Sequence, residues 1–247
     1  MPLKAVLFDL WETLIQDLPD RNHPRRTWRT TAVREVLAEH GFDVNLEPVG
    51  NALDVTSRAL TTLHDEGRDL DAGGRAELFL TRLDAETLRV APRSAAGALH
   101  EVIASMPLDM APHLAPHAAE TLAALRDHNL GIGLVSNAGM TTAPNLRRML
   151  NHYGIHDLFD VLVFSDEVLF AKPDARIFAA ALDAMGHDAA DCAFVGDNPH
   201  NDVYGATRAG LFAVQIGAKT REGITPHARI DSLSELIPAL ATAFELP

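Results

Sequence analysis

Asp9 is the residue around which this chain could carry out chemistry. It follows the apolar run Ala5-Val6-Leu7-Phe8 and is followed by Leu10. An unbroken apolar run of this length is typical of a strand that is buried on both faces, as in a parallel sheet. A carboxylate at the end of such a strand is costly unless another group pairs with it or a reaction uses it. We therefore expect a functional role for Asp9, the alternative being an acid that only caps a turn.

Three later stretches place polar side chains in comparable positions. Two of them end predicted strands, and one begins a predicted helix. In chain order, the four stretches are Asp9-Leu10-Trp11-Glu12-Thr13-Leu14, Val135-Ser136-Asn137, Lys172-Pro173-Asp174 and Phe194-Val195-Gly196-Asp197, the last followed by Asp202. Together they resemble the motifs of the haloacid dehalogenase superfamily of hydrolases. One such motif alone would carry little weight, whereas the full set in the family's order is a specific match.

The resemblance implies an α/β fold: a doubly wound parallel sheet with the first strand at its centre and an inserted helical-bundle cap domain. Asp9, Ser136 and Asp197 would then meet at the carboxyl edge of the sheet, on strands about 5 Å apart. Carboxylates this close repel unless a cation or a shared proton intervenes. Mg²⁺ suits a site with one or two carboxylates and a substrate phosphate. The resemblance gives Mg²⁺ as the cofactor and Asp9, the backbone oxygen of Trp11 and Asp197 as its ligands.

The resemblance also assigns roles around the transferred group. Asp9 would be the nucleophile, and Lys172 would neutralise it and an incoming phosphoryl oxygen, the alternative being a solvated lysine. Ser136 and the backbone of Asn137 would donate hydrogen bonds to the same group, as an oxyanion hole does. The expected catalytic residues are Asp9, Lys172 and Ser136, and the expected substrate-binding residues are Thr13, Trp11, Ser136, Asn137 and Lys172.

Two further positions concern the surroundings of these motifs. Asp202 is expected behind the reacting groups, where it would hold Lys172 or a metal-bound water, and an ordinary helix N-cap is the alternative. Leu169 stands near a place where family members often carry glycine. The loop before Lys172 is therefore expected to be stiffer than in those proteins or differently shaped.

Trp11 is the main departure from the family pattern. Family phosphatases usually carry a second aspartate two residues after the nucleophile, as general acid and base, and an indole cannot transfer a proton. Glu12 or a cap residue would have to replace it. Dehalogenases of the family have a tyrosine there, but they are metal-independent and lack the acidic strand end that Asp197 and Asp202 supply. We therefore predict an Mg²⁺-dependent phosphatase that acts on a small phosphorylated metabolite through a phosphorylated Asp9. A 2-haloacid dehalogenase and a ligand-binding or regulatory protein with little or no catalytic activity remain as alternatives.

Hydrophobic periodicity divides the chain into two parts. Helical patterns without a strand pattern fill residues 28–40, 47–64, 76–88 and 95–105. From residue 116 on, predicted helices alternate with strands at 131–135, 161–164, 193–195 and 212–216. These patterns predict a core of residues 1–15 and 109–247, a helical cap of residues 16–108, and a polar hinge over 16–26. Arg25, Arg26 and Arg29 at the start of the cap could bind a substrate anion or simply face solvent.

Composition limits the classes of partner. The 247 residues include 21 Lys and Arg against 34 Asp and Glu, a net charge of −13, which argues against nucleic-acid and anionic-membrane surfaces. A hydrophobic fraction of 47% is enough for a proper core. The single Cys192 lies in an apolar run and cannot form a disulfide within the chain. With no apolar run long enough to span a membrane, we expect a cytoplasmic monomer or homodimer that acts on a small-molecule phosphorylated substrate.

Overall fold

The computed structural model describes residues 2–17, 22–83 and 93–246. Within them, parallel strands form one six-stranded sheet in the order β5-β4-β1-β6-β7-β8. The strands are β1 (Ala5–Phe8), β4 (Gly131–Ser136), β5 (Val161–Phe164), β6 (Cys192–Gly196), β7 (Phe212–Ile216) and β8 (Ala228–Ile230). The predicted strands and the central place of β1 are thereby confirmed. The short edge strand β8 was not predicted, because three residues are too few to show a pattern.

The strand β1 is apolar throughout because helices cover both faces of the sheet. Val6 and Phe8 belong to the cluster on one face, and Ala5 and Leu7 belong to the cluster on the other. All four side chains are fully buried. The first face packs against α6 (Ala118–Asp127), α7 (Ala143–His152) and α11 (Leu236–Ala241), and the second against α9 (Ala175–Met185) and α10 (Gly205–Arg208). This is the α/β architecture that the sequence predicted.

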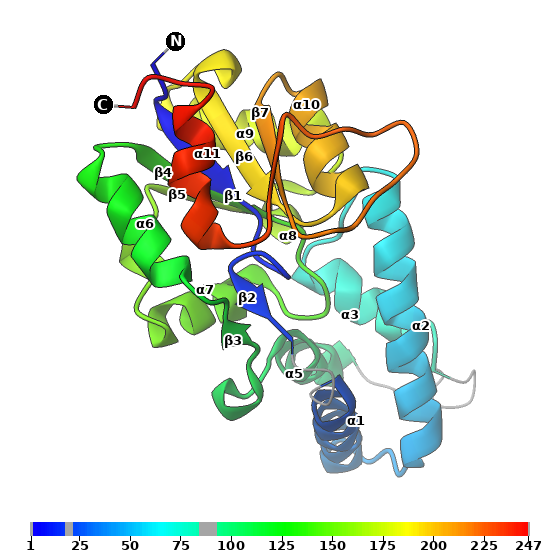
Figure 1. Cartoon of the computed structure of the whole chain (residues 1–247). Coiled ribbons are helices and arrows are strands. Elements are labelled where there is room, and N and C mark those ends of the chain that lie inside the picture. Colours follow the sequence, from blue (N-terminus) through cyan, green and yellow to red (C-terminus); the bar gives the residue numbers. More distant parts are fainter. Residues whose placement is uncertain (1, 18–21, 84–92, 247) are drawn as a thin grey trace.

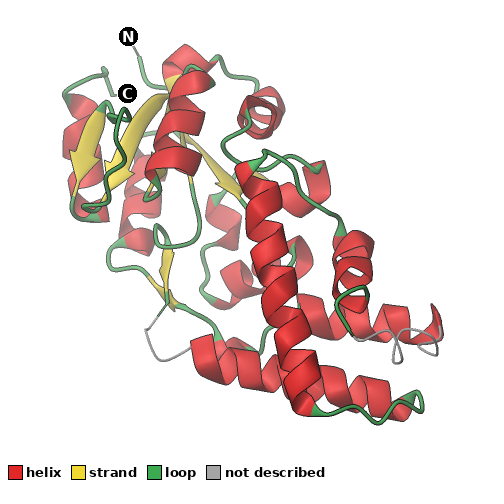
Figure 2. Cartoon of the chain, turned by 90° about the vertical axis from the view of Figure 1, so that its right-hand side faces the viewer, coloured by secondary structure: helices red, strands yellow, loops and turns green. Residues whose placement is uncertain are grey.

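A helical bundle lies to one side of the sheet (Figures 1 and 2). Its described helices are α1 (Asn22–Glu39), α2 (Leu46–Asp65), α3 (Ala72–Leu80) and α5 (Arg93–Ala104). They enclose an apolar cluster of their own, which includes Val33, Leu53, Phe79 and Leu99. None of the helices in the described part of the chain is long and apolar enough to cross a membrane.

The structure corrects two boundaries of the predicted helices. The hinge was placed over residues 16–26, but α1 already begins at Asn22, and Pro24 lies in its first turn, where a missing N–H costs nothing. The helix predicted over residues 76–88 begins at Ala72 and ends at Leu80, and residues 84–88 lie outside the described ranges. Its start is fixed by Asp71, whose side chain accepts a hydrogen bond from the Gly74 N–H at 2.7 Å.

Two short strands, β2 (Ile15–Gln16) and β3 (His113–Leu114), pair antiparallel beside the bundle (Figure 1). They lie on the two segments that connect β1 and α6 to the helices between them in the sequence. Two residues per strand leave no periodicity to recognise, so this ribbon was not predicted.

Candidate active site

Asp9 lies immediately beyond β1, at the carboxyl edge of the sheet. Its N–H donates to the Val195 carbonyl at 2.8 Å, which extends the pairing with β6 by one residue. The side chain is 8% exposed. One carboxylate oxygen, Oδ1, accepts a hydrogen bond from Lys172 Nζ at 2.5 Å, and Oδ2 faces the Thr13 hydroxyl at 3.4 Å. The nucleophile predicted from the sequence is thus buried beside a cation and held by the loop that follows it.

Lys172 is buried and bridges two acids. Its Nζ donates to Asp9 Oδ1 and, at 2.7 Å, to Asp202 Oδ1. The alternative of a solvated lysine is wrong, since the side chain is 2% exposed. The Lys172 peptide is clamped by Asn137, whose side chain accepts from its N–H at 2.8 Å and donates to its carbonyl at 3.0 Å. Sequence reasoning used only the backbone of Asn137 and missed this positioning role of its side chain.

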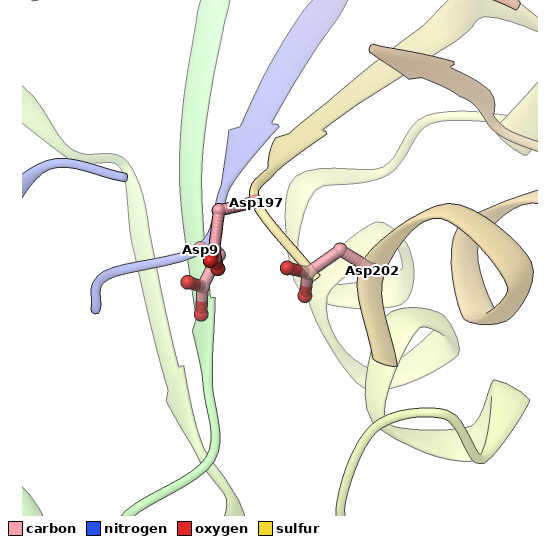
Figure 3. Close-up of side chains that lie close together, drawn as sticks. All are labelled: Asp9, Asp197 and Asp202. Atoms are coloured by element: carbon pink, nitrogen blue, oxygen red, sulfur yellow. The ribbon is translucent and has the colours of Figure 1, made fainter. Parts of the chain in front are cut away.

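Asp197 and Asp202 complete a carboxylate cluster with Asp9 (Figure 3). One oxygen from each lies within 4.8 Å of the others. Asp197 follows β6, and Asp202 comes from the helical turn η4 (Pro199–Tyr204). A Cβ on Gly196 would overlap the Asp202 carboxylate, so glycine is required for this approach. Asp197 and Asp202, which are five residues apart in the sequence, are thereby brought close together in space.

The surroundings of Asp202 decide between its predicted roles. Its Oδ1 holds Lys172, and its Oδ2 accepts from the Asn198 N–H at 2.9 Å. The N-cap alternative is wrong, because the residue that caps η4 is Asn198, which accepts from the His200 and Asn201 N–H groups. Both oxygens of Asp202 are thus used to hold neighbouring parts of the chain.

Burial dominates the electrostatics of the cluster. It raises the pKa of Asp9 to about 7, opposed by Lys172 and reinforced by Asp202 and Asp197. Burial also raises the pKa of Asp197, with Lys219 opposing it. For Lys172, burial alone would lower the pKa, but Asp202 and Asp9 more than offset it, so its pKa is raised. The site therefore favours additional positive charge.

The donor set fits a hard divalent cation. Lys172 pairs with Asp9 and Asp202, and Lys219 pairs with Asp197, so two lysines face three carboxylates. Carboxylate oxygens at such spacing are the ligands that Mg²⁺ takes. Asp9 and Asp197 are the residues that would hold it, since both oxygens of Asp202 accept short hydrogen bonds, at 2.7 and 2.9 Å, whereas Oδ2 of Asp9 has only the long 3.4 Å contact with Thr13 among the described residues. Lys219 was not predicted, because the exposed loop after β7 carries no motif around it.

The other predicted residues lie around the same edge. Ser136 ends β4, the neighbour of β1, and is fully buried, with its hydroxyl 3.4 Å from the Asn137 carbonyl. Trp11 is half-buried, and its backbone forms a bridge with Ile15. Glu12 is exposed and has a positive φ of 58°, and its carboxylate accepts from the Asp17 N–H at 3.3 Å. Glu12 therefore has a structural contact of its own.

A cleft between the bundle and the sheet leads toward these groups. It has a larger compartment of about 360 Å³ that reaches Arg29 and a smaller one of about 210 Å³ that reaches Asn137. The compartments share Trp11, Ser57, Gly139 and Met140 as lining residues. Asp9 lines neither of them, but the side chain of Asn137 that clamps Lys172 does. The cleft thus extends from the edge of the catalytic cluster, past Trp11, to the bundle.

The parallel sheet and the acids and lysine at its carboxyl edge define a hydrolase of the haloacid dehalogenase-like class. Residues 3–210 match the model of the haloacid dehalogenase-like hydrolase family, and the chain belongs to this family. The resemblance found in the sequence is thereby confirmed, together with the prediction that the protein is a hydrolase.

Relatives found by sequence include a nucleotidase and several phosphatases. The chain is 36% identical to pyrimidine 5'-nucleotidase YjjG of Escherichia coli (strain K12) over 156 residues, which are 62% of the chain and 65% of that protein. It is 27% identical to phosphoglycolate phosphatase of Yersinia pestis over 249 residues, which are 96% of the chain and 93% of the relative. The alignments with the first three relatives span about half to two thirds of those proteins' length.

Solved structures of both functional types share the fold. A HAD phosphatase from Thermococcus onnurineus has a TM-score of 0.67 at 22% identity, covering 96% of this chain and 98% of that one. A 2-haloacid dehalogenase from Pseudomonas syringae pv. Tomato DC3000 has a TM-score of 0.66 at 24% identity, covering 98% and 99%. At such identities the likeness shows the fold alone and does not separate the two activities.

Proposed function

We propose that the protein is an Mg²⁺-dependent phosphatase that acts on a small phosphorylated metabolite through Asp9. The observation that carries this proposal is the cluster of Asp9, Asp197 and Asp202, with one oxygen from each within 4.8 Å of the others. Displacement of halide from carbon needs one buried carboxylate and no such cluster, whereas phosphoryl transfer needs positive charge at the site. Relatives that are named phosphatases support the same interpretation.

Each residue of the site would have its own role in phosphoryl transfer. Asp9 would attack phosphorus through Oδ2, the oxygen that Lys172 does not bind, and the bond from phosphorus to the leaving-group oxygen would break, so that this oxygen departs as an anion. Water would then cleave the phosphorylated Asp9, which releases inorganic phosphate and restores the carboxylate. Lys172 would then stabilise the developing charge, with Ser136 and the Asn137 N–H as further donors. Asp9 and Asp197 would hold Mg²⁺, which would supply positive charge to neutralise the phosphoryl oxygens. Asp202 keeps Lys172 in place throughout.

The structure supports a site without the usual general acid. Trp11 occupies that position in the sequence and carries no transferable proton, and Glu12 is turned to solvent with the Asp17 N–H as its partner. Losing a general acid costs about 10²–10⁴ in rate when the leaving group needs a proton. Substrates with acidic leaving groups, such as aryl phosphates and acyl phosphates, are therefore expected to be good substrates.

The helical bundle is proposed to be the cap that selects the substrate. Its described helices fall between residues 22 and 104, within the residues 16–108 predicted as the cap, and the cleft between it and the sheet is lined from both sides. Such a unit excludes water and chooses the substrate while the chemistry stays with the core.

The test measures phosphate release from aryl phosphates and halide release from 2-haloacids, each with Mg²⁺ and with a chelator. We expect phosphate release that requires Mg²⁺ and is abolished in Asp9→Asn, because an amide cannot act as the nucleophile. Asp157→Asn, the same change on a side chain that is 96% exposed, is the matched control and should keep full activity.

Two other outcomes would overturn the proposal. Trp11 is the observation that favours a dehalogenase, since the family's dehalogenases are aromatic at this position. Halide release that persists in chelator would establish that activity instead. Release of neither product, with the fold intact, would favour a binding protein.

A further inference from the structure

We infer that Arg29 binds a second anionic group of the substrate, so that the preferred substrates are phosphomonoesters with a carboxylate or second phosphate at the far end. This inference rests on the proposed phosphatase function, because it concerns the opposite end of the same cleft. It names a specificity-determining residue on the bundle, whereas the motif residues all lie in the core.

Arg29 differs from the two arginines beside it in the larger compartment of the cleft. Arg25 forms an ion pair with Asp17. Arg26 donates to both oxygens of Asp54, at 2.8 and 2.7 Å. Arg29 Nη2 donates only to neutral oxygens, the Ser105 carbonyl at 2.9 Å and the Thr141 hydroxyl at 3.4 Å. Among the residues that the structure describes, no carboxylate forms an ion pair with Arg29.

The guanidinium of Arg29 is also poorly solvated. Its Nε lies buried without a hydrogen-bond partner in the described structure. Burial, assisted by repulsion from Arg25, lowers the pKa of Arg29 to about 10, so the group is still a cation at neutral pH. Arg29 is partly buried, and a cation that is partly removed from water without a counter-ion is costly. The unpaired buried Nε–H adds to that cost. An anionic ligand in the cleft would offset both.

The residues that line the cleft indicate what the remainder of the ligand should look like. The smaller compartment is lined by Asn137, which binds the backbone of Lys172, and the phosphoryl group would lie on this side of the cleft. The indole of Trp11 lines both compartments, and Leu53, Met106 and Met140 supply apolar wall in the larger one. A ligand that matches this lining has a phosphate at one end, a weakly polar middle part and a second anionic group that contacts Arg29. A short or planar linker between two anions matches it.

The test compares three aryl phosphates that differ only at the para position. They carry a carboxylate, a phosphonate or an uncharged carboxamide, and kcat/KM is measured for each with saturating Mg²⁺. A hydrogen bond to a charged group contributes about 1.5–3 kcal/mol, so the enzyme should prefer an anionic substrate to the amide by about 10–10²-fold. Arg29→Gln should abolish this preference while keeping turnover of the amide. Whether the carboxylate or the phosphonate is preferred identifies the second group.

Two further variants separate recognition from general effects. Arg26→Gln removes one positive charge from the same helix and the same compartment, but from an arginine already paired with Asp54. It should leave the preference intact. Arg29→Lys, which keeps the charge without the planar fork, should keep part of the preference. An equal fall for all three substrates in Arg29→Gln would show a purely structural role. Equal loss of preference in Arg26→Gln would show a diffuse charge effect. Either result overturns the inference and leaves the phosphatase function standing.

Failure of the proposed function has a different signature. In that case none of the three substrates releases phosphate. The affinity of Asp9→Asn for the same compounds, with and without Arg29→Gln, then tests Arg29 by calorimetry without turnover. Affinities that do not depend on the para charge would overturn the inference.

Discussion

Two clusters of charged side chains in this protein differ in their balance of positive and negative charge. The catalytic cluster at the sheet edge contains three carboxylates and two lysines. The second cluster, which we call the junction, consists of His64, Asp69 and Arg75 of the bundle and Ser165 of the core. Here one acid faces one arginine, and Asp69 accepts from Arg75 Nη2 at 2.8 and 2.7 Å and from the Ser165 hydroxyl at 2.5 Å.

The difference between the clusters follows from what each must do. Both side chains of the Asp69–Arg75 pair are at most 1% exposed, and neither lines the cleft. Arg75 also donates to the Ala138 and Gly139 carbonyls at 2.7 and 3.1 Å. A balanced pair of this kind holds two parts of the chain together. At the sheet edge, by contrast, three carboxylates face two lysines, and this excess of negative charge favours the binding of a cation.

The junction also supports the catalytic cluster through the backbone. The Asp69 N–H donates to the Leu169 carbonyl, and the Ala171 N–H donates to the Gly67 carbonyl, both at 3.2 Å. These contacts fasten the bundle to the segment that leads directly into Lys172. On the other side, the carbonyls that Arg75 binds follow Asn137. The bundle thus grips the two loops that carry Lys172 and its clamp.

The largest expected effect on stability comes from breaking the junction. Arg75→Met leaves the buried Asp69 carboxylate without its arginine, and it leaves the Ala138 and Gly139 carbonyls without the donors that Arg75 supplies. Removing one partner of a buried pair costs about 3–5 kcal/mol of unfolding free energy. Urea unfolding followed by circular dichroism measures this loss. Arg126→Met, which breaks a half-exposed pair with Asp160, should cost less than about 1 kcal/mol. Equal losses would mean that the junction does not hold the fold.

The catalytic cluster should respond in activity. Lys172→Met removes the donor shared by Asp9 and Asp202, and kcat/KM for an aryl phosphate should fall by at least about 10²–10³-fold. Lys219→Met is the matched control, because its exposed ammonium pairs with Asp197 alone. Its effect should be clearly smaller. An unchanged kcat/KM for Lys172→Met would remove Lys172 from the mechanism.

The contrast between the two clusters also explains which site residues could be predicted from the sequence. Asp9, Ser136 and Asp197 were placed correctly because each directly follows or ends an apolar strand, and parallel strands end at one edge. Leu169 was noted because glycine is usual there, and its φ of 62° shows the left-handed conformation that glycine adopts readily.

The junction could not be predicted in the same way. Asp69 and Arg75 are six residues apart, but Ser165 is 96 residues from Asp69, and only the packing of the bundle on the core brings them together. No local pattern marks such a contact. The same holds for Lys219, which meets Asp197 from a loop after another strand.

The smallest expected effect concerns the neighbouring acids Asp69 and Asp166. Their contributions to the unfolding free energy should change in opposite directions with pH. Burial alone would raise the pKa of Asp69, but His64, Arg75 and Ser165 more than offset it, so its pKa is lowered. For Asp166, burial raises the pKa, and the Ala143 N–H, which donates at 3.0 Å, only partly opposes this. Ionisation of Asp69 thus favours the fold, while ionisation of Asp166 opposes it.

The two acids should therefore respond oppositely to acid. A lowered folded pKa stabilises above the unfolded value of about 3.9 and is lost as pH falls through the folded pKa. A raised folded pKa stabilises below the unfolded value and is lost as pH rises toward the folded pKa. Unfolding free energies of wild type, Asp69→Asn and Asp166→Asn are compared between about pH 5 and pH 3, below the usual range of histidine titration. As pH falls, the advantage of wild type over Asp69→Asn should shrink, while its stability relative to Asp166→Asn should rise. Asparagine keeps an acceptor oxygen in both variants, so the difference reports charge. Parallel trends for the two variants would show that Asp69 is not stabilised as an anion by the junction.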